Sequence, residues 1–271
     1  MQPHLNTQYA MKEEIRKELF RIEQQRDVKI LYAVESGSRA WGFASIDSDW
    51  DVRYIYIHNL DWYLGIDDKK DNHEEILPNG IDLAGWEFRK ALRLFRKSNP
   101  PMLEWLRSPI VYLQSYSAAE RLRELTSEFF NPKSCLYHYL HMAEGNFRVY
   151  LQKDIVRVKK YFYVLRPILA CDWIRQTGTM APMEFHKLLD SHAAEENVKT
   201  EIRNLLKRKL AGEELNDEPK IKVLNDYLEQ KLQFNRDYVK SLGPAPQPQT
   251  ERLNELFRET INEAWGGGGN R

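Results

Sequence analysis

Two aspartates, Asp49 and Asp51, stand two residues apart at the start of a segment that is predicted to be a β-strand, residues 50–57. Alternate side chains of a strand leave the same face, so both carboxylates are expected to point into one space. Carboxylates that converge in this way repel each other unless a cation lies between them, and such hard oxygen ligands suit Mg²⁺ or Mn²⁺. Surface loops also carry Asp-x-Asp, so the pattern needs support from its neighbours.

A glycine–serine turn precedes these aspartates. Residues 28–34 are predicted to form a buried strand that runs into Gly37 and Ser38, where a helix is predicted to begin. Exposed backbone N–H groups at a helix start, beside a serine hydroxyl, form an anion site. A phosphate bound there would lie next to a metal ion held by the aspartates.

A third carboxylate follows on a later strand. Asn79 and Gly80 predict a hairpin turn, and Asp82 comes directly after it. Two metal ions ~3.5–4 Å apart typically need a shared carboxylate pair and one more ligand, which Asp82 would supply. Glu87 is an alternative third carboxylate, although a helix start favours acidic side chains without any function.

Charge is distributed unevenly along a chain of zero net charge. Residues 31–82 hold eleven acidic and four basic residues, whereas residues 89–123 hold eight basic and two acidic ones. Metal cations and phosphates would require such an acidic patch beside a basic stretch, but ordinary solvated helix faces give the same pattern. Arg53, on the same face as Asp51, is placed to neutralise the carboxylate cluster.

The elements that would position these residues indicate an α+β fold in two domains. Strand and helix patterns alternate in residues 1–112, and we find only helical patterns from residue 102 onward, which make residues 113–243 an all-helical domain. Residues 244–271 comprise a proline-rich linker, one more amphipathic helix and a glycine-rich tail.

Composition narrows the class of protein. The chain has 271 residues, 42% of them hydrophobic, which excludes a disordered chain, and its 13 glycines and 12 prolines are too few for a fibrous one. No apolar run approaches the ~18–20 residues of a membrane-spanning helix, and the N-terminus does not read as a secretory signal. Cys135 and Cys171 cannot build a disulfide framework. We therefore expect a cytoplasmic protein without a membrane segment.

The order of these motifs resembles the DNA polymerase β-like nucleotidyltransferase superfamily, in which a Gly-Gly or Gly-Ser turn precedes Asp-x-Asp and a distal aspartate. Longer segments resemble a narrower bacterial and phage family of nucleotidyltransferases associated with RNA repair. The resemblance covers most of residues 28–175 and lies in three strings: ESGSRAWGFASIDSDWDVRYIYI, IDLAGWEFRKALRLFRKSNPPMLEWLRSP and KKYFYVLRPILACDWI.

The resemblance implies a polymerase β-like domain with a small mixed sheet, followed by helices, and a role for each motif residue. Gly37 and Ser38 would hold the phosphates of a nucleoside triphosphate such as ATP. Asp49 and Asp51 would bind Mg²⁺ or Mn²⁺, and Asp82 would bind the catalytic metal ion and help to activate the attacking hydroxyl. The implied reaction transfers a nucleoside monophosphate to an acceptor hydroxyl, with release of pyrophosphate.

The resemblance also places cations and an aromatic ring from the helical domain across the cleft. Lys160 and Arg166 are the candidates for contacts with the phosphates, and Tyr161 is the candidate beside the nucleotide. The alternative is that these side chains belong to a solvated face and to the core. Arg39 follows the Gly-Ser turn and is a candidate phosphate ligand, with a surface ion pair to Asp47 or Asp49 as its alternative.

Two functions remain open from the sequence. The first is a nucleotidyltransferase whose acceptor is an RNA 3′ end, a protein hydroxyl or a small molecule. The second is a catalytically silent nucleotide- or RNA-binding regulator on the same fold. The presence of all three carboxylates and of the Gly-Ser turn favours the enzyme, because a degenerate relative is expected to lose a carboxylate.

Overall fold

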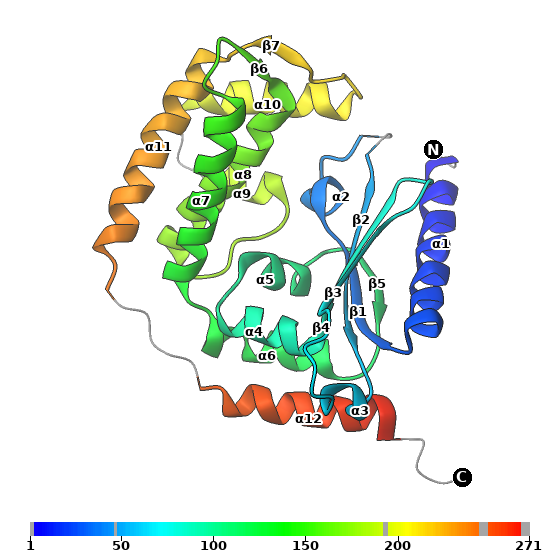
Figure 1. The fold of residues 1–271 in the computed structure, drawn as a ribbon. Coiled ribbons are helices and arrows are strands. Elements are labelled where there is room, and N and C mark those ends of the chain that lie inside the picture. The colour runs from blue at the N-terminus through cyan, green and yellow to red at the C-terminus, as the bar shows by residue number, and fades with distance from the viewer. Residues whose placement is uncertain (1–2, 46–47, 192–194, 244–248, 267–271) are drawn as a thin grey trace.

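A five-stranded mixed sheet lies at the centre of the first half of the chain (Figure 1). The computed structural model describes residues 3–45, 48–191, 195–243 and 249–266. The strands follow the order β3-β4-β2-β1-β5; β2 and β4 run parallel, and the other neighbours are antiparallel. Their bounds are β1 Lys29–Glu35, β2 Trp50–Ile57, β3 Asn72–Ile76, β4 Ile81–Glu87 and β5 Val111–Gln114.

Each face of this sheet is covered by helices because its strands alternate buried side chains between the two faces. Helix α1 (Pro3–Arg26) packs Ile15, Leu19 and Ile22 against one face. The other face packs against the helices that follow β4 and β5 (Figure 1). These helices are α4 Phe88–Arg96, α5 Pro100–Leu106 and α6 Ala118–Phe129, and the short helices α2 Gly37–Trp41 and α3 Leu60–Tyr63 lie at the strand ends.

Helices dominate the second half, as the sequence predicts. Helices α7 and α8 pack along each other, and α11 packs on both. The bounds are α7 Pro132–Tyr150, a 3₁₀ turn η1 Val158–Lys160, α8 Tyr161–Thr177, α9 Phe185–Ser191, α10 Glu196–Leu210 and α11 Lys222–Ser241. Among the described helices, none is both long and apolar enough to cross a membrane.

The expectation of helices alone after residue 101 needs a correction. Strand β5 pairs with β1, so the sheet continues to residue 114, beyond the expected division at residue 112. A two-stranded ribbon, β6 Ile155–Arg157 and β7 Asp217–Pro219, joins the helices. These strands have three or four residues each, too few for a period-two pattern to show in the sequence.

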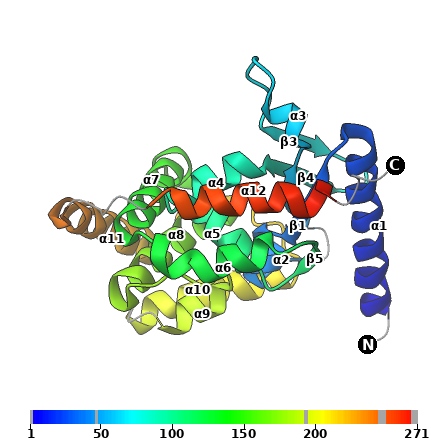
Figure 2. The same cartoon turned by 90° about the horizontal axis from the view of Figure 1, so that it is seen from below.

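Helix α12 (Glu251–Trp265) returns to the first half of the chain (Figure 2). It packs against α4 and α6, where its Phe257 ring meets Tyr63 and Phe88 with ring centroids 5.0 and 6.0 Å away. One buried apolar cluster runs from the α4–α6 layer through α7 and α8 to α12. The proposed division into residues 1–112, 113–243 and 244–271 stays a prediction.

Candidate active site

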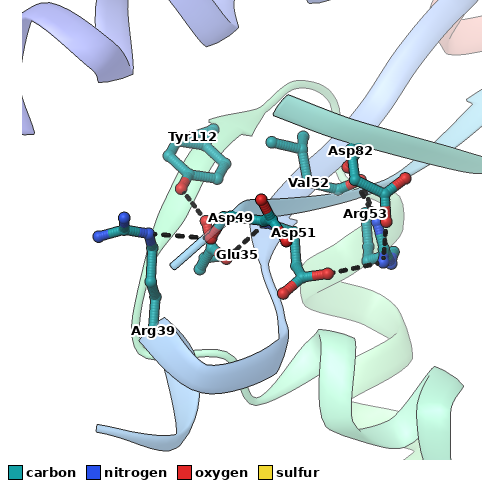
Figure 3. Close-up of polar contacts among 8 residues, drawn as sticks. All are labelled: Glu35, Arg39, Asp49, Asp51, Val52, Arg53, Asp82 and Tyr112. Carbon is teal, nitrogen blue, oxygen red and sulfur yellow. Dashed lines mark hydrogen bonds and ion pairs between the residues drawn. The ribbon is translucent and has the colours of Figure 1, made fainter. Parts of the chain in front are cut away.

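The parallel pairing of β2 with β4 brings two of the predicted aspartates together. Asp51 and Asp82 are direct partners in the strand register, so their side chains leave the same face of adjacent strands. Between them lies the guanidinium of Arg53 (Figure 3), whose Nη2 contacts Asp51 Oδ1 at 3.0 Å and Asp82 Oδ2 at 2.8 Å. Arg53 therefore neutralises the carboxylate pair, as the alternation of side chains along the strand predicts.

Main-chain contacts hold Arg53 in this position. Its Nη1 donates to the carbonyl oxygen of Asp82 at 2.9 Å and to that of Val52 at 3.1 Å, and the side chain is only 18% exposed. One oxygen of each carboxylate accepts a hydrogen bond from Arg53. Within the described ranges, Asp51 Oδ2 and Asp82 Oδ1 make no hydrogen bond to the protein.

The remaining predicted carboxylate, that of Asp49, lies just before β2 and lines the same cavity as Asp51. In the part of the chain that the structure describes, its side chain has no ion-pair partner. Burial raises the pKa of the Asp51 carboxyl above its usual value; Arg53 opposes this shift, and the charges of Asp82 and Asp49 add to it. The three carboxylates thus lie close enough to influence one another.

The Gly-Ser turn packs directly on Asp51. Gly37 has a φ of +58°, and a Cβ atom at this position would lie 2.0 Å from Asp51 Oδ2. Only glycine allows this close approach. The neighbouring Ser36 donates its N–H to the Asp51 carbonyl oxygen at 2.8 Å, which ties the turn to β2. Gly37, Ser38, Asp49 and Asp51 line one cavity of about 350 Å³.

Glu35, the last residue of β1, binds the backbone of Asp51. It was not among the predicted site residues. Its carboxylate accepts the Asp51 N–H at 2.9 Å and the hydroxyl proton of Tyr112 (Figure 3). The side chain is fully buried, and this burial raises the pKa of Glu35 to about 7. The available sequence signal was a lone acidic residue at the end of an otherwise apolar strand, directly before the turn.

This shift predicts a pH-dependent stability. Below its folded pKa of about 7, Glu35 keeps a proton that the unfolded chain releases near 4.5, so the free energy of unfolding falls as the pH rises between these values. Each unit of pH corresponds to about 1.4 kcal/mol. Glu35→Gln keeps an acceptor oxygen for the Asp51 N–H but cannot ionise. Urea unfolding of both proteins is measured at pH 5 and at pH 8. Between these pH values the free energy of unfolding of the parent should fall by roughly 3 kcal/mol more than that of the variant. The same pH dependence in both proteins would contradict the assignment.

Arg39 positions the aspartate loop rather than lining the cavity. Its Nη2 donates to the Ser48 carbonyl oxygen at 2.6 Å and its Nε to the Asp49 carbonyl oxygen at 3.1 Å. The guanidinium lies 3.7 Å from the centroid of the Trp50 ring. The alternative ion pair with the Asp49 carboxylate does not form, because the backbone of the loop accepts the guanidinium donors. The other partner considered, Asp47, lies outside the described residues.

The helical half of the chain supplies the opposite wall of the cavity. Lys159 lines it from the 3₁₀ turn η1, Phe162 and Tyr163 from the start of α8, and Lys209 from the end of α10. Lys160, which the sequence favoured, lies beside this wall with Nζ 4.4 Å from the Tyr150 ring centroid. Burial, with Lys159 nearby, lowers the pKa of Lys160.

Tyr161 and Arg166 lie in the core, so the structure favours the alternative interpretation of these two residues. The Tyr161 hydroxyl accepts the Ile221 N–H at 2.9 Å and donates to Asn225. Arg166 is buried and forms an ion pair with Glu104 at 2.9 Å. Neither side chain lines the cavity; the neighbouring Lys159 and Tyr163 do. Glu87 likewise has a structural role, as the N-cap of α4.

The donor set suits a hard divalent cation in its chemistry. Asp51 Oδ2 and Asp82 Oδ1 are carboxylate oxygens free of Arg53, and Asp49 adds a third carboxylate beside the cavity. In the present arrangement, however, the described residues contain no group of three His, Cys, Asp or Glu side chains close enough to share one metal ion. Metal binding by Asp49, Asp51 and Asp82 therefore stays a prediction.

The mixed sheet pairs Asp51 with Asp82 in register and sets Asp51 against the Gly-Ser turn, an arrangement that agrees with the polymerase β-like nucleotidyltransferases that the motifs resemble. Residues 11–259 match the RNA repair pathway DNA polymerase beta family, and the chain belongs to this family. The uncharacterized protein YcgL of Bacillus subtilis (strain 168) is 49% identical over 259 residues, which cover 96% of this chain and all of YcgL. The family resemblance of the motifs is thereby confirmed.

One solved structure with a detectable likeness is a nucleotidyltransferase-like protein from Exiguobacterium sibiricum. It is 10% identical, with a TM-score of 0.34, and the likeness covers 92% of this chain and 80% of that protein.

Proposed function

We propose that the protein is a Mg²⁺- or Mn²⁺-dependent nucleotidyltransferase that transfers a nucleoside monophosphate from a nucleoside triphosphate, such as ATP, to an acceptor hydroxyl. An RNA 3′ end is the acceptor that the family description favours. The observation that carries the proposal is the register pairing of Asp51 with Asp82, which leaves one carboxylate oxygen of each available, with Asp51 against the Gly-Ser turn.

The cavity offers groups for each part of such a substrate. The Ser38 hydroxyl and the Lys159 ammonium group lie on opposite walls and would contact the phosphates, and the Tyr163 ring would pack against the nucleoside. A divalent cation bound by the aspartates would neutralise the charge that develops on the phosphoryl oxygens. Asp82 does not line this cavity, so we assign it to the side from which the acceptor hydroxyl approaches.

A labelling experiment tests the reaction. The protein is incubated with each α-labelled nucleoside triphosphate, Mg²⁺ or Mn²⁺, and in turn single-stranded RNA, tRNA and the protein alone. Transfer of label to one acceptor, with release of pyrophosphate, supports the proposal if it vanishes in the double variant Asp49→Ala, Asp51→Ala. Transfer that persists in this variant would assign the chemistry to other residues.

The position of Arg53 favours a second candidate, a nucleotide- or RNA-binding regulator without catalytic activity. Arg53 already neutralises Asp51 and Asp82, and main-chain carbonyls hold it in place, so the carboxylate pair is stable without a cation. Saturable binding of nucleoside triphosphate, with no pyrophosphate released on any acceptor, would identify the regulator. Release of pyrophosphate would exclude it.

Lys159→Ala should weaken the binding of nucleoside triphosphate about ten- to hundredfold, because a charge-assisted contact with phosphate contributes about 1.5–3 kcal/mol. Lys153→Ala is the matched control, since Lys153 is exposed in the segment between α7 and β6 and does not line the cavity. Isothermal titration calorimetry with a non-hydrolysable analogue gives both affinities. Equal affinities in the two variants would remove Lys159 from the triphosphate site.

A further inference from the structure

A second cavity, of about 320 Å³, is lined by residues of α4 and α12 and by Thr250. Figure 2 shows these two packed helices. The cavity is remote from the aspartates. Asp82 is the second residue of β4, whereas α4 begins directly after the last residue of that strand, so Asp82 lies roughly 15–20 Å from the start of α4 at ~3.3 Å per residue. The two cavities share no lining residue among those described. A ligand here would not compete for the cavity beside the Gly-Ser turn.

Three arginines form one wall of this cavity. Arg89, Arg93 and Arg96 recur at intervals of four and three residues and therefore share one face of α4. Across the described ranges, none of the three forms an ion pair with a carboxylate. Arg96 Nη1 instead donates to the Thr250 hydroxyl oxygen at 2.9 Å, and Arg89 lies over the Tyr63 ring, 5.3 Å from its centroid.

Among the described residues that line the cavity, none is acidic and could balance these charges. Its remaining polar lining is Thr250 and Asn254, and its apolar lining includes Leu92 and Phe257. Glu87, which interacts electrostatically with Arg89, is buried and accepts the backbone N–H groups at the start of α4.

The cavity between α7 and α11 makes the contrast clear. It has a similar volume, about 390 Å³, but its lining carries both signs of charge. There Arg236 forms an ion pair with Glu144 at 2.7 Å. Among the described residues that line the cavity between α4 and α12, by contrast, the charged side chains are all arginines.

We propose that the cavity between α4 and α12 binds a phosphorylated nucleotide unit, either a free nucleoside monophosphate or one nucleotide of a single-stranded RNA. Guanidinium groups bind phosphate oxygens with paired N–H donors, and an apolar floor with an aromatic ring suits a nucleobase. The volume lies at the lower end of the range for small-molecule sites, which matches one nucleotide rather than a folded partner.

Binding in EDTA tests this site without involving catalysis, so it can fail independently of the proposed transferase. Affinity is measured for adenosine monophosphate by calorimetry and for a short fluorescein-labelled single-stranded RNA by anisotropy. Arg93→Glu is compared with Lys97→Glu, because Lys97 is exposed at the end of the same helix, carries the same charge and does not line the cavity. Thermal melting of both variants confirms that they are folded.

We expect Arg93→Glu to weaken binding at least tenfold and Lys97→Glu to change it by no more than about twofold. Weakening for both probes, or for adenosine monophosphate alone, identifies a mononucleotide site. Weakening for RNA alone, with a salt dependence reduced by about 0.7 in log–log slope per lost phosphate contact, identifies the strand as the ligand. Absence of binding by both probes, or equal effects of the two variants, would overturn the proposal.

Discussion

Asp51→Asn should lower the rate of nucleotide transfer by about a thousandfold while the fold stays intact. The amide has the size of the carboxylate and still accepts a hydrogen bond from Arg53, but it carries no charge to hold a cation or to offset charge in the transition state. Loss of one such preorganised group typically costs about 10²–10³ in turnover. The initial rate of label transfer at saturating substrate measures the effect.

Asp67→Asn is the matched control, because Asp67 is an exposed carboxylate outside the cavity. We expect this control to transfer at the parent rate. The melting temperature of Asp51→Asn should stay within about 3 °C of the parent, since a partly exposed ion pair contributes little to stability. Full activity in Asp51→Asn would exclude this residue from the reaction and leave the carboxylate pair with a structural role.

Gly85→Ala should destabilise the protein by about 3 kcal/mol. Gly85 lies in β4, and a Cβ atom there would come within 2.3 Å of the Tyr54 ring carbons. That ring cannot withdraw, because Tyr54 is fully buried and its hydroxyl is hydrogen-bonded to His73. Urea unfolding of the variant and the parent gives the difference in free energy.

Gly145→Ala provides the opposite expectation in the same chain. Gly145 lies within helix α7, and a Cβ atom there would have no heavy atom within 4 Å. Alanine is the better helix former, so this variant should gain roughly 0.5–1 kcal/mol. A Gly85→Ala variant as stable as the parent would mean that β2 and β4 do not pair in this register. The alignment of Asp51 with Asp82, which depends on the same register, would then be wrong as well.

Local patterns in the sequence predict much of the first half of the fold. Strand β2 has the bounds that its alternation predicts, residues 50–57, and the turn at Asn79 and Gly80 joins β3 to β4 as expected. The pairing of Asp51 with Asp82 depends on a parallel register between strands that are not consecutive. A single sequence contains no information about such a register, so the prediction that Asp82 lies near Asp51 depended on the family resemblance.

Local patterns could not tell whether Lys159 or Lys160, just before α8, lines the cavity. A 3₁₀ turn, Val158–Lys160, precedes this helix. Such a turn has 3.0 residues per turn instead of 3.6, so it rotates Lys159 relative to the helix that follows. A uniform helical pattern from residue 159 onward cannot place it. Lys209 and Thr250 come from distant segments, and their positions beside a cavity depend on tertiary packing alone.

The placement of α12 has a consequence for synthesis of the chain. This helix buries Leu256 and Ile261 beneath the layer of α4 and α6, yet it follows every other described element in the sequence. During translation, the apolar underside of that layer stays uncovered until the ribosome has passed residue 265. A nascent chain that stalls before residue 251 therefore exposes an apolar surface to chaperones and proteases, even though Asp49, Asp51 and Asp82 have already been synthesised.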